Sequence, residues 1–389
     1  MRPHGDRNKE PGITPEFQLV AACCRWPDDA GRSAAVTRAA PRGTNWEEVV
    51  RLADRHRVEP LVGHGLTGAG LAVPESLAAL IEAQRAASLR DVGETLRIAA
   101  ALDSAGITHR FLKGAALGVA SYGSPLLKHS WDVDLLVLPR DAVAAAAVLA
   151  ALDYTPRMPP RPFDQQEFAR WSVVSKEAEL VSARGTVVEL HWRVSDHPDL
   201  LTGITAATAA RRIALLGSNQ VSTLEDSANV AYLAVHGTSH AWARLKWIAD
   251  FNAFMTSFED CARADLLAKA RQRGVGRAID CALSLADDLF GDRRSGAAPT
   301  ASSLIVASRA ALAADDQDRI DVQSARARWR ICPTLAYRAR ESRLRLRGSV
   351  DRLDHPLPRK WEFLYPAVRI PFFFLRWLRR RERKGAGHN

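Results

Sequence analysis

Two aspartates separated by one residue, Asp132 and Asp134, stand at the beginning of an apolar run, Leu135–Leu138. In a β-strand, residues i and i+2 point to the same face, so this spacing places the two carboxylates side by side. Such charges are costly to bury, and a divalent cation removes that cost. Mg²⁺ is typically held by one or two carboxylates together with substrate phosphates. The pair therefore predicts a site for Mg²⁺ or Mn²⁺, unless this strand edge simply faces solvent.

A third carboxylate, Glu189, occurs in a later apolar segment, Val187–Trp192. It reaches the same edge if that segment forms a neighbouring strand. Three acidic groups around one or two cations are suited to phosphoryl or nucleotidyl transfer. We therefore take Asp132, Asp134 and Glu189 as candidate catalytic and metal-binding residues. His191 shares a strand face with Glu189 and is a candidate partner of its carboxylate or a contact for an acceptor.

A lysine-glycine pair, Lys113-Gly114, ends the apolar segment that precedes the aspartates. Glycine lets backbone N–H groups approach a phosphate, and the helix that follows presents its N-terminus to the anion. Lys113 adds a positive charge, and Lys128 lies in an expected loop from which it can reach triphosphate oxygens. These three residues are candidates for nucleotide binding. The alternatives are an ordinary strand-to-helix turn and a solvated lysine.

Two histidines, His236 and His240, are four residues apart and share one face of an expected helix. No additional ligand completes a zinc-protease pattern, so zinc is not expected. With Lys246 and Asp250 nearby in the sequence, this face is a candidate contact for the nucleotide or the acceptor. The alternative is a polar helix face packed by neighbouring tryptophans.

The elements that must position these residues form a small α/β unit inside a largely helical chain. Strands are expected at 107–112, 132–138, 179–181 and 187–192, with helices at 115–122 and 140–152. A helical period extends over 17–105 and again over 224–290, and Thr44 or Asn45 can cap one helix. The expected organisation is a disordered segment 1–16, a helical region 17–105, an α/β core 106–215, a helical region 216–292 and a basic, partly helical segment 293–389.

The composition is that of an ordinary globular protein, with 389 residues and a net charge of +10. This basic balance favours polyanionic partners. The five cysteines lack paired spacing, which argues against a disulfide framework. No signal peptide or membrane-spanning run is evident, so a cytoplasmic location is expected. Aromatic and arginine residues in 369–384 predict a weak contact with an anionic membrane surface or nucleic acid. A helix docked on the body of the protein is the alternative.

The order of these motifs resembles the uncharacterised nucleotidyltransferase family of the polymerase-beta-like superfamily. The resemblance covers about 17–260, including a leading helical region with Trp46 and His56. Its motifs are Leu112-Lys113-Gly114-Ala115-Ala116, Tyr122, Trp131-Asp132-Val133-Asp134-Leu135-Leu136-Val137, Val188-Glu189-Leu190-His191-Trp192 and the helical stretch His236–Asp250.

The resemblance implies an α+β fold, with a small mixed sheet flanked by N-terminal and C-terminal helical regions. It implies that Asp132 and Asp134 ligate the metal, and that Glu189 binds metal or takes the proton of the attacking hydroxyl. The expected activity is metal-dependent transfer of a nucleotidyl group from a nucleoside triphosphate to an unidentified small molecule, peptide or RNA. Lys113-Gly114 replaces the superfamily's Gly-Ser pair, and Lys128 stands where the family usually has arginine. The alternative is therefore a catalytically degenerate nucleotide-binding protein, associated with a membrane surface.

Overall fold

The computed structural model describes residues 14–291, 303–347, 357–365 and 367. Its fold is α+β, with a small mixed sheet flanked by helices, as the sequence predicted. Of the segment 1–16 that was expected to be disordered, residues 1–13 lie outside the described residues, as does the tail 369–384. Pro15 and Glu16 were expected to be disordered as well, but they belong to the first turn of a helix, Pro15–Cys23, which Thr14 caps by accepting a hydrogen bond from the backbone N–H of Phe17. Within the described part, no helix has both the length and the apolar character needed to cross a membrane. All five cysteines are free thiols.

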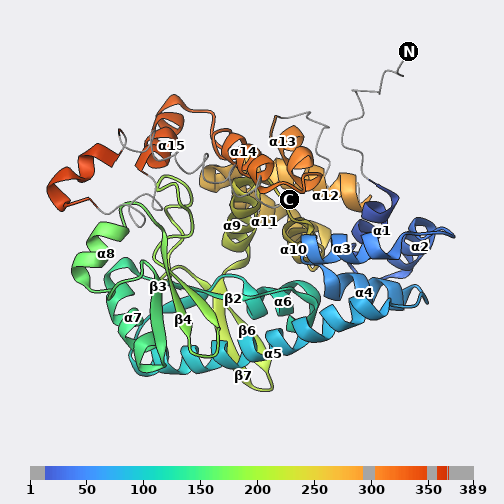
Figure 1. The fold of residues 1–389 in the computed structure, drawn as a ribbon, viewed down its shortest axis with the longest axis horizontal. Coiled ribbons are helices and arrows are strands. Elements are labelled where there is room, and N and C mark those ends of the chain that lie inside the picture. Colours follow the sequence, from blue (N-terminus) through green and yellow to red (C-terminus); the bar gives the residue numbers. More distant parts are fainter. Residues whose placement is uncertain (1–13, 292–302, 348–356, 366, 368–389) are drawn as a thin grey trace, which may run out of the picture.

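The N-terminal region is helical, as expected. Asn45 caps one of its helices by accepting a hydrogen bond from the backbone N–H of Glu48, which fixes where that helix begins. Figure 1 shows the last and longest helix, α5, running from the other N-terminal helices to a position beneath the sheet. The helices are α1 (Pro15–Cys23), α2 (Ala30–Ala39), α3 (Trp46–His56), α4 (Glu59–Gly68) and α5 (Glu75–Ser104).

The central sheet has five strands in the order β1-β2-β5-β4-β3. Only the β2–β5 pair is parallel, and the other three pairings are antiparallel. Helix α6 connects β1 to β2, and α7 and α8 flank β3. The elements are β1 (His109–Phe111), α6 (Gly114–Tyr122), β2 (Asp132–Val137), α7 (Ala142–Ala151), β3 (Tyr154–Met158), α8 (Gln165–Trp171), β4 (Glu177–Ser182) and β5 (Val187–His191).

A separate hairpin, β6 (Ala210–Leu216) with β7 (Asn219–Leu224), packs beside β1. The sequence did not predict it, and the expected border between 215 and 216 falls inside it. Residues in β6 alternate between exposed and buried positions, which is the period of a strand with one face on the core. Strand β3 and helix α8 were also not predicted.

The remaining described chain is mostly helical. Where α9 turns into α10, Gly237 touches the fully buried ring of Trp242, and a Cβ built at Gly237 would lie 2.2 Å from that ring. The helices are α9 (Asp226–Ser239), α10 (Leu245–Thr256), α11 (Asp260–Ala270), α12 (Gly276–Phe290), α13 (Ser303–Leu312), α14 (Gln317–Arg328) and α15 (Leu335–Arg347).

Candidate active site

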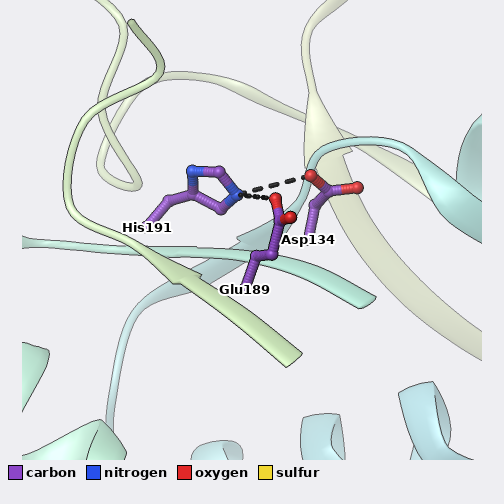
Figure 2. Close-up of side chains that lie close together, drawn as sticks. All are labelled: Asp134, Glu189 and His191. Carbon is purple, nitrogen blue, oxygen red and sulfur yellow. Dashed lines mark ion pairs between the residues drawn. The ribbon is translucent and has the colours of Figure 1, made fainter. Parts of the chain in front are cut away.

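The parallel pairing of β2 with β5 brings two of the three predicted acidic residues, Asp134 and Glu189, together, whereas Asp132 stands opposite Val187 and is not part of their cluster. Asp134 stands opposite Glu189, and His191 is two residues further along the same strand face. Figure 2 shows the three side chains directed toward one another from the two strands. One potential ligand atom from each lies within 4.8 Å of the others, and His191 Nε2 is 3.3 Å from both Asp134 Oδ1 and Glu189 Oε2. The two strands are therefore neighbours, which was the condition for Glu189 to reach the aspartate edge.

Asp134 is the most buried carboxylate of the cluster, with a side chain 1% exposed. Lys113 Nζ lies 2.7 Å from its Oδ1. Neither carboxylate oxygen has a partner in hydrogen-bonding geometry among the described residues. Burial alone would raise the pKa of Asp134, but the charges of Lys113 and His191 outweigh it and hold that pKa well below its usual range. The carboxylate is therefore anionic, and Lys113 and His191 are the cations beside it.

His191 is a buried imidazole placed between carboxylates. Its Nδ1 lies 3.0 Å from Glu177 Oε2, and Lys176 pairs with the same Glu177. Burial and Lys176 lower the pKa of His191, but Glu177 and the contact with Asp134 outweigh them and raise it to about 10. The imidazole is therefore charged near neutral pH, and it holds Asp134 and Glu189 side by side.

Sequence reasoning did not identify Lys176 and Glu177, which lie next to His191 at the beginning of the neighbouring strand. The sequence indicated a strand beginning at Glu179, but β4 begins two residues earlier. In the antiparallel β4–β5 register, Glu177 faces His191. The period of two that placed Glu189 and His191 on one face would have placed Glu177 there too, had the strand been extended backward.

Asp132 lines a small cavity with Asp91, Lys113 and Gly114, among other residues. The cavity has a free volume of about 10 Å³, room for roughly one water molecule or ion. Burial and the charge of Asp134 raise the pKa of Asp132 to about 6, despite the opposing charge of Lys113. Burial and the charge of Asp132 likewise raise the pKa of Asp91 to about 6.

Asp91 was not predicted as a site residue, although a pattern around it was visible. Helix α5 carries buried polar residues at Gln84, Ser88, Asp91 and Thr95, spaced as one face of a helix. Gln84 donates a hydrogen bond to the backbone oxygen of Ser130, just before β2. A polar stripe on a buried helix face indicates a polar neighbour, and here that neighbour is the candidate site.

Residues 42–291 match the model of a family described as uncharacterised nucleotidyltransferases. The chain belongs to this family. The match confirms the family that the motif order predicted. Among curated proteins, no similar sequence was found. The family and the carboxylate cluster together support nucleotidyl transfer as the general class of activity and a nucleoside triphosphate as the substrate.

Lys128 and Asp250, both predicted as possible ligand contacts, form an ion pair with each other. Both residues are 4% exposed, and Lys128 Nζ donates to Asp250 Oδ2 at 2.6 Å. The hydroxyl of Tyr122 donates to the other carboxylate oxygen at 2.9 Å. This geometry favours a structural role, in which the trio ties α10 to α6 and the turn before β2. It leaves neither charge directed at a nucleotide.

The two helix histidines form an aromatic group with Trp247. The ring centroids of His236 and His240 are 4.8 Å apart, and both are within 6 Å of the Trp247 ring. Within the described chain, the cluster of potential metal ligands does not include either histidine. Burial and the nearby charge of Lys113 hold the pKa of His236 well below its usual range, so this ring is neutral. These observations favour packing beside the site over metal binding.

Lys246 is half-buried near the first turn of α10. Burial and the charge of Lys128 lower its pKa to about 7, although the charges of Asp132 and Asp250 oppose this shift. Lys246 forms no hydrogen bond or ion pair with the residues that the structure describes, so its amine remains a candidate contact for a phosphate.

Proposed function

We propose that this protein transfers a nucleotidyl group from a nucleoside triphosphate to an acceptor and releases pyrophosphate. The observation that carries the proposal is the convergence of Asp134 and Glu189 across the parallel β2–β5 pair, with Asp132 on the same strand face. The acceptor class is a small molecule, a peptide or RNA.

The side chains fit a divalent cation. Both oxygens of Asp134 are buried without a hydrogen-bond partner among the described residues, and Glu189 lies within ligand distance of the same point. Carboxylate oxygens are the ligands that Mg²⁺ and Mn²⁺ prefer, so Asp132, Asp134 and Glu189 would hold the metal. Bound there, it would supply Lewis acidity to activate the attacking oxygen and stabilise the leaving pyrophosphate.

Lys113 links phosphate binding to metal binding in this proposal. Its ammonium pairs with Asp134, so a cation approaching Asp134 meets a positive charge. The triphosphate offers Lys113 and Gly114 an alternative anion at the N-terminus of α6. As Lys113 turns toward phosphate, Asp134 is released for the metal. Cation binding should therefore strengthen when nucleotide is present.

Glu189 is the residue we assign to proton transfer. Its side chain is 21% exposed, whereas that of Asp134 is 1% exposed, so Glu189 is the more accessible to an acceptor. Its carboxylate accepts the proton of the attacking hydroxyl, and His191 fixes its orientation. His191 remains charged and acts by positioning.

The direct test is pyrophosphate release with each labelled nucleoside triphosphate and a panel of acceptors from the three classes. Glu189→Gln should largely abolish release and leave nucleotide binding mostly intact, whereas Asp132→Asn with Asp134→Asn should also abolish Mn²⁺ binding. Glu179→Gln is the matched control, because Glu179 faces Glu189 on the neighbouring strand but is neutralised by Arg157 at 2.7 Å.

Unchanged Mn²⁺ binding in the double aspartate variant would refute the metal assignment. Nucleotide binding by the native protein without pyrophosphate release from any nucleotide and acceptor would favour the second function, a nucleotide-binding protein without turnover. The observation behind that alternative is the Lys113–Asp134 pair, which occupies the metal side of the site.

A further inference from the structure

Trp131, the residue immediately before Asp132, carries a large aromatic side chain at the surface. It is 63% exposed, and its indole N–H has no hydrogen-bond partner among the described residues. The guanidinium of Arg57 lies over the ring, 4.3 Å from its centroid. By contrast, the exposed Trp329 donates its indole N–H to Ser342 at 3.4 Å. Trp131 therefore presents a ring that an arginine holds from one face and that is otherwise open to a ligand.

Arg57 occupies a backbone conformation that usually belongs to glycine or asparagine. It follows α3 in the left-handed region, with a φ of 56°, and its backbone N–H donates to the carbonyl oxygens of Ala53 and Asp54. Its side chain forms no ion pair within the described part of the chain, and it contacts the ring of Trp131. A large side chain at a strained backbone position indicates a use for that side chain.

Two contacts bring the surroundings of Arg57 and Trp131 together with the beginning of α10. His129 Nδ1 lies 3.0 Å from Glu59 Oε2, which joins the turn before β2 to the beginning of α4. The backbone N–H of Leu245 donates to a ring nitrogen at the end of α3, at 3.2 Å. The end of α3, the turn before β2 and the first turn of α10 therefore meet at one place.

Lys246 brings a second cation to this place. It follows Leu245 in the first turn of α10, and it has no hydrogen bond or ion pair with the residues that the structure describes. Burial and the charge of Lys128 lower its pKa to about 7, and the charges of Asp132 and Arg57 also act on it. Lys246 is therefore close both to the candidate metal-binding aspartate and to the arginine that holds the exposed ring.

The chemistry of this surface selects a nucleotide. An exposed aromatic ring stacks on a nucleobase, and neighbouring arginine and lysine side chains attract phosphate. An apolar peptide or a lipid chain would leave both cations without a partner, and inorganic phosphate would leave the ring uncovered. A nucleotide satisfies the ring and the cations in one ligand.

We propose that Trp131, supported by Arg57, stacks on the base of the nucleoside triphosphate, with Lys246 beside its phosphates. The inference rests on the proposed function, because it assigns the base of the triphosphate that the transfer reaction would consume. Stacking uses the face that every nucleobase has, so the contact should serve all of the common nucleotides.

The test is calorimetry on the full-length protein with Mg²⁺, using each common nucleoside triphosphate and inorganic triphosphate, which lacks a base. In Trp131→Ala, the affinity for every nucleoside triphosphate should fall about tenfold or more, because a stacking contact is lost. The affinity for inorganic triphosphate should not change. Trp131→Phe keeps an aromatic ring and should retain most of the affinity.

Trp329→Ala is the matched control. Trp329 is 44% exposed, and the guanidinium of Arg338 lies 4.7 Å from the centroid of its ring, but it belongs to the end of α14. This variant should bind every ligand as the native protein does. Thermal unfolding of Trp131→Ala should match that of the native protein, because the side chain is mostly exposed, and a loss of affinity is then not a loss of folding.

Arg57→Asn tests the support of the ring. Asparagine tolerates the left-handed backbone, so the substitution removes the guanidinium without adding strain. The variant should bind nucleoside triphosphates more weakly than the native protein, because the ring of Trp131 loses the group that holds it. An unchanged affinity in this variant would overturn the proposed support by Arg57.

Equal losses for nucleoside triphosphates and inorganic triphosphate in Trp131→Ala would show that the ring contacts no base, and would overturn the proposal. Unchanged nucleotide affinity with weaker binding of a short RNA would place the ring at the acceptor, and would overturn it as well. Pyrophosphate release by the native protein with unchanged nucleotide affinity in Trp131→Ala refutes only the stacking contact. A base-dependent loss of affinity without any pyrophosphate release refutes only the transfer reaction.

Discussion

Replacing Lys128 with methionine distinguishes a structural lysine from a phosphate contact. The ion pair with Asp250 is buried on both sides, with side chains 4% and 5% exposed. Removing one partner of a buried pair leaves an uncompensated charge and typically costs about 3–5 kcal/mol. Tyr122 still donates to Asp250, which favours the lower part of that range. Total stabilities are about 5–15 kcal/mol, so the loss is a substantial share.

The assay is urea unfolding followed by circular dichroism and tryptophan fluorescence, whose coincidence checks that the transition is two-state. Lys269→Met is the matched control. Lys269 pairs with Asp265 at the same 2.6 Å, but both side chains are more than half exposed. The control substitution Lys269→Met should lower the free energy of unfolding by no more than about 1 kcal/mol. Adding Asp250→Asn to Lys128→Met should recover much of the loss. Unchanged unfolding with weaker nucleotide binding in Lys128→Met would refute the structural role and restore the phosphate contact.

Three further predictions concern the site and its support. Mn²⁺ affinity should fall as the pH drops through about 6, because burial and Asp134 raise the pKa of Asp132 to that value and the protonated acid is a poor ligand; equal affinities at about pH 5 and 7 would contradict this. In the absence of nucleotide, the Lys113→Met variant should bind Mn²⁺ more tightly than the native protein, because the ammonium that pairs with Asp134 is gone. The same variant should bind nucleotide more weakly, and calorimetry would measure both affinities. Weaker binding of both ligands would rule out competition between Lys113 and the metal at Asp134. Gly237→Ala should lose about 1–3 kcal/mol in urea unfolding, because its Cβ meets the Trp242 ring, whereas Gly93→Ala faces open space and should lose nothing.

The strand faces of the site could be predicted, because Asp132 and Asp134 in β2, and Glu189 and His191 in β5, are each spaced by two beside apolar residues. Asp134 and Glu189 then share a face whenever the strands are neighbours, and the parallel register places them opposite each other. The helical regions followed from the 3.6-residue period and from caps such as Asn45. The local sequence pattern was sufficient to predict a helix or strand whenever its buried residues recur on one face.

The sequence could not establish which charges neutralise one another. Lys128 and Asp250 are separated by 122 residues, and both looked available for a ligand until the structure paired them. Asp91 lies 41 residues before Asp132, on a helix with no strand period to connect them. The hairpin β6–β7 was missed because its alternating pattern is short and is interrupted near its start by the charged residues Arg211 and Arg212. Partners distant in sequence are chosen by tertiary packing.

The parallel β2–β5 pairing also determines when the site comes into being during synthesis and folding. Parallel strands cannot be joined by a tight turn, so α7, β3, α8 and β4 all lie between Asp134 and Glu189 in the chain. A nascent chain that ends before Val187 carries both aspartates but lacks their partner strand. The pairing of β2 with β5 is therefore a contact between residues distant in sequence, and such contacts form slowly during folding. The three acids can therefore come together only late in synthesis, when the N-terminal helical region has already left the ribosome.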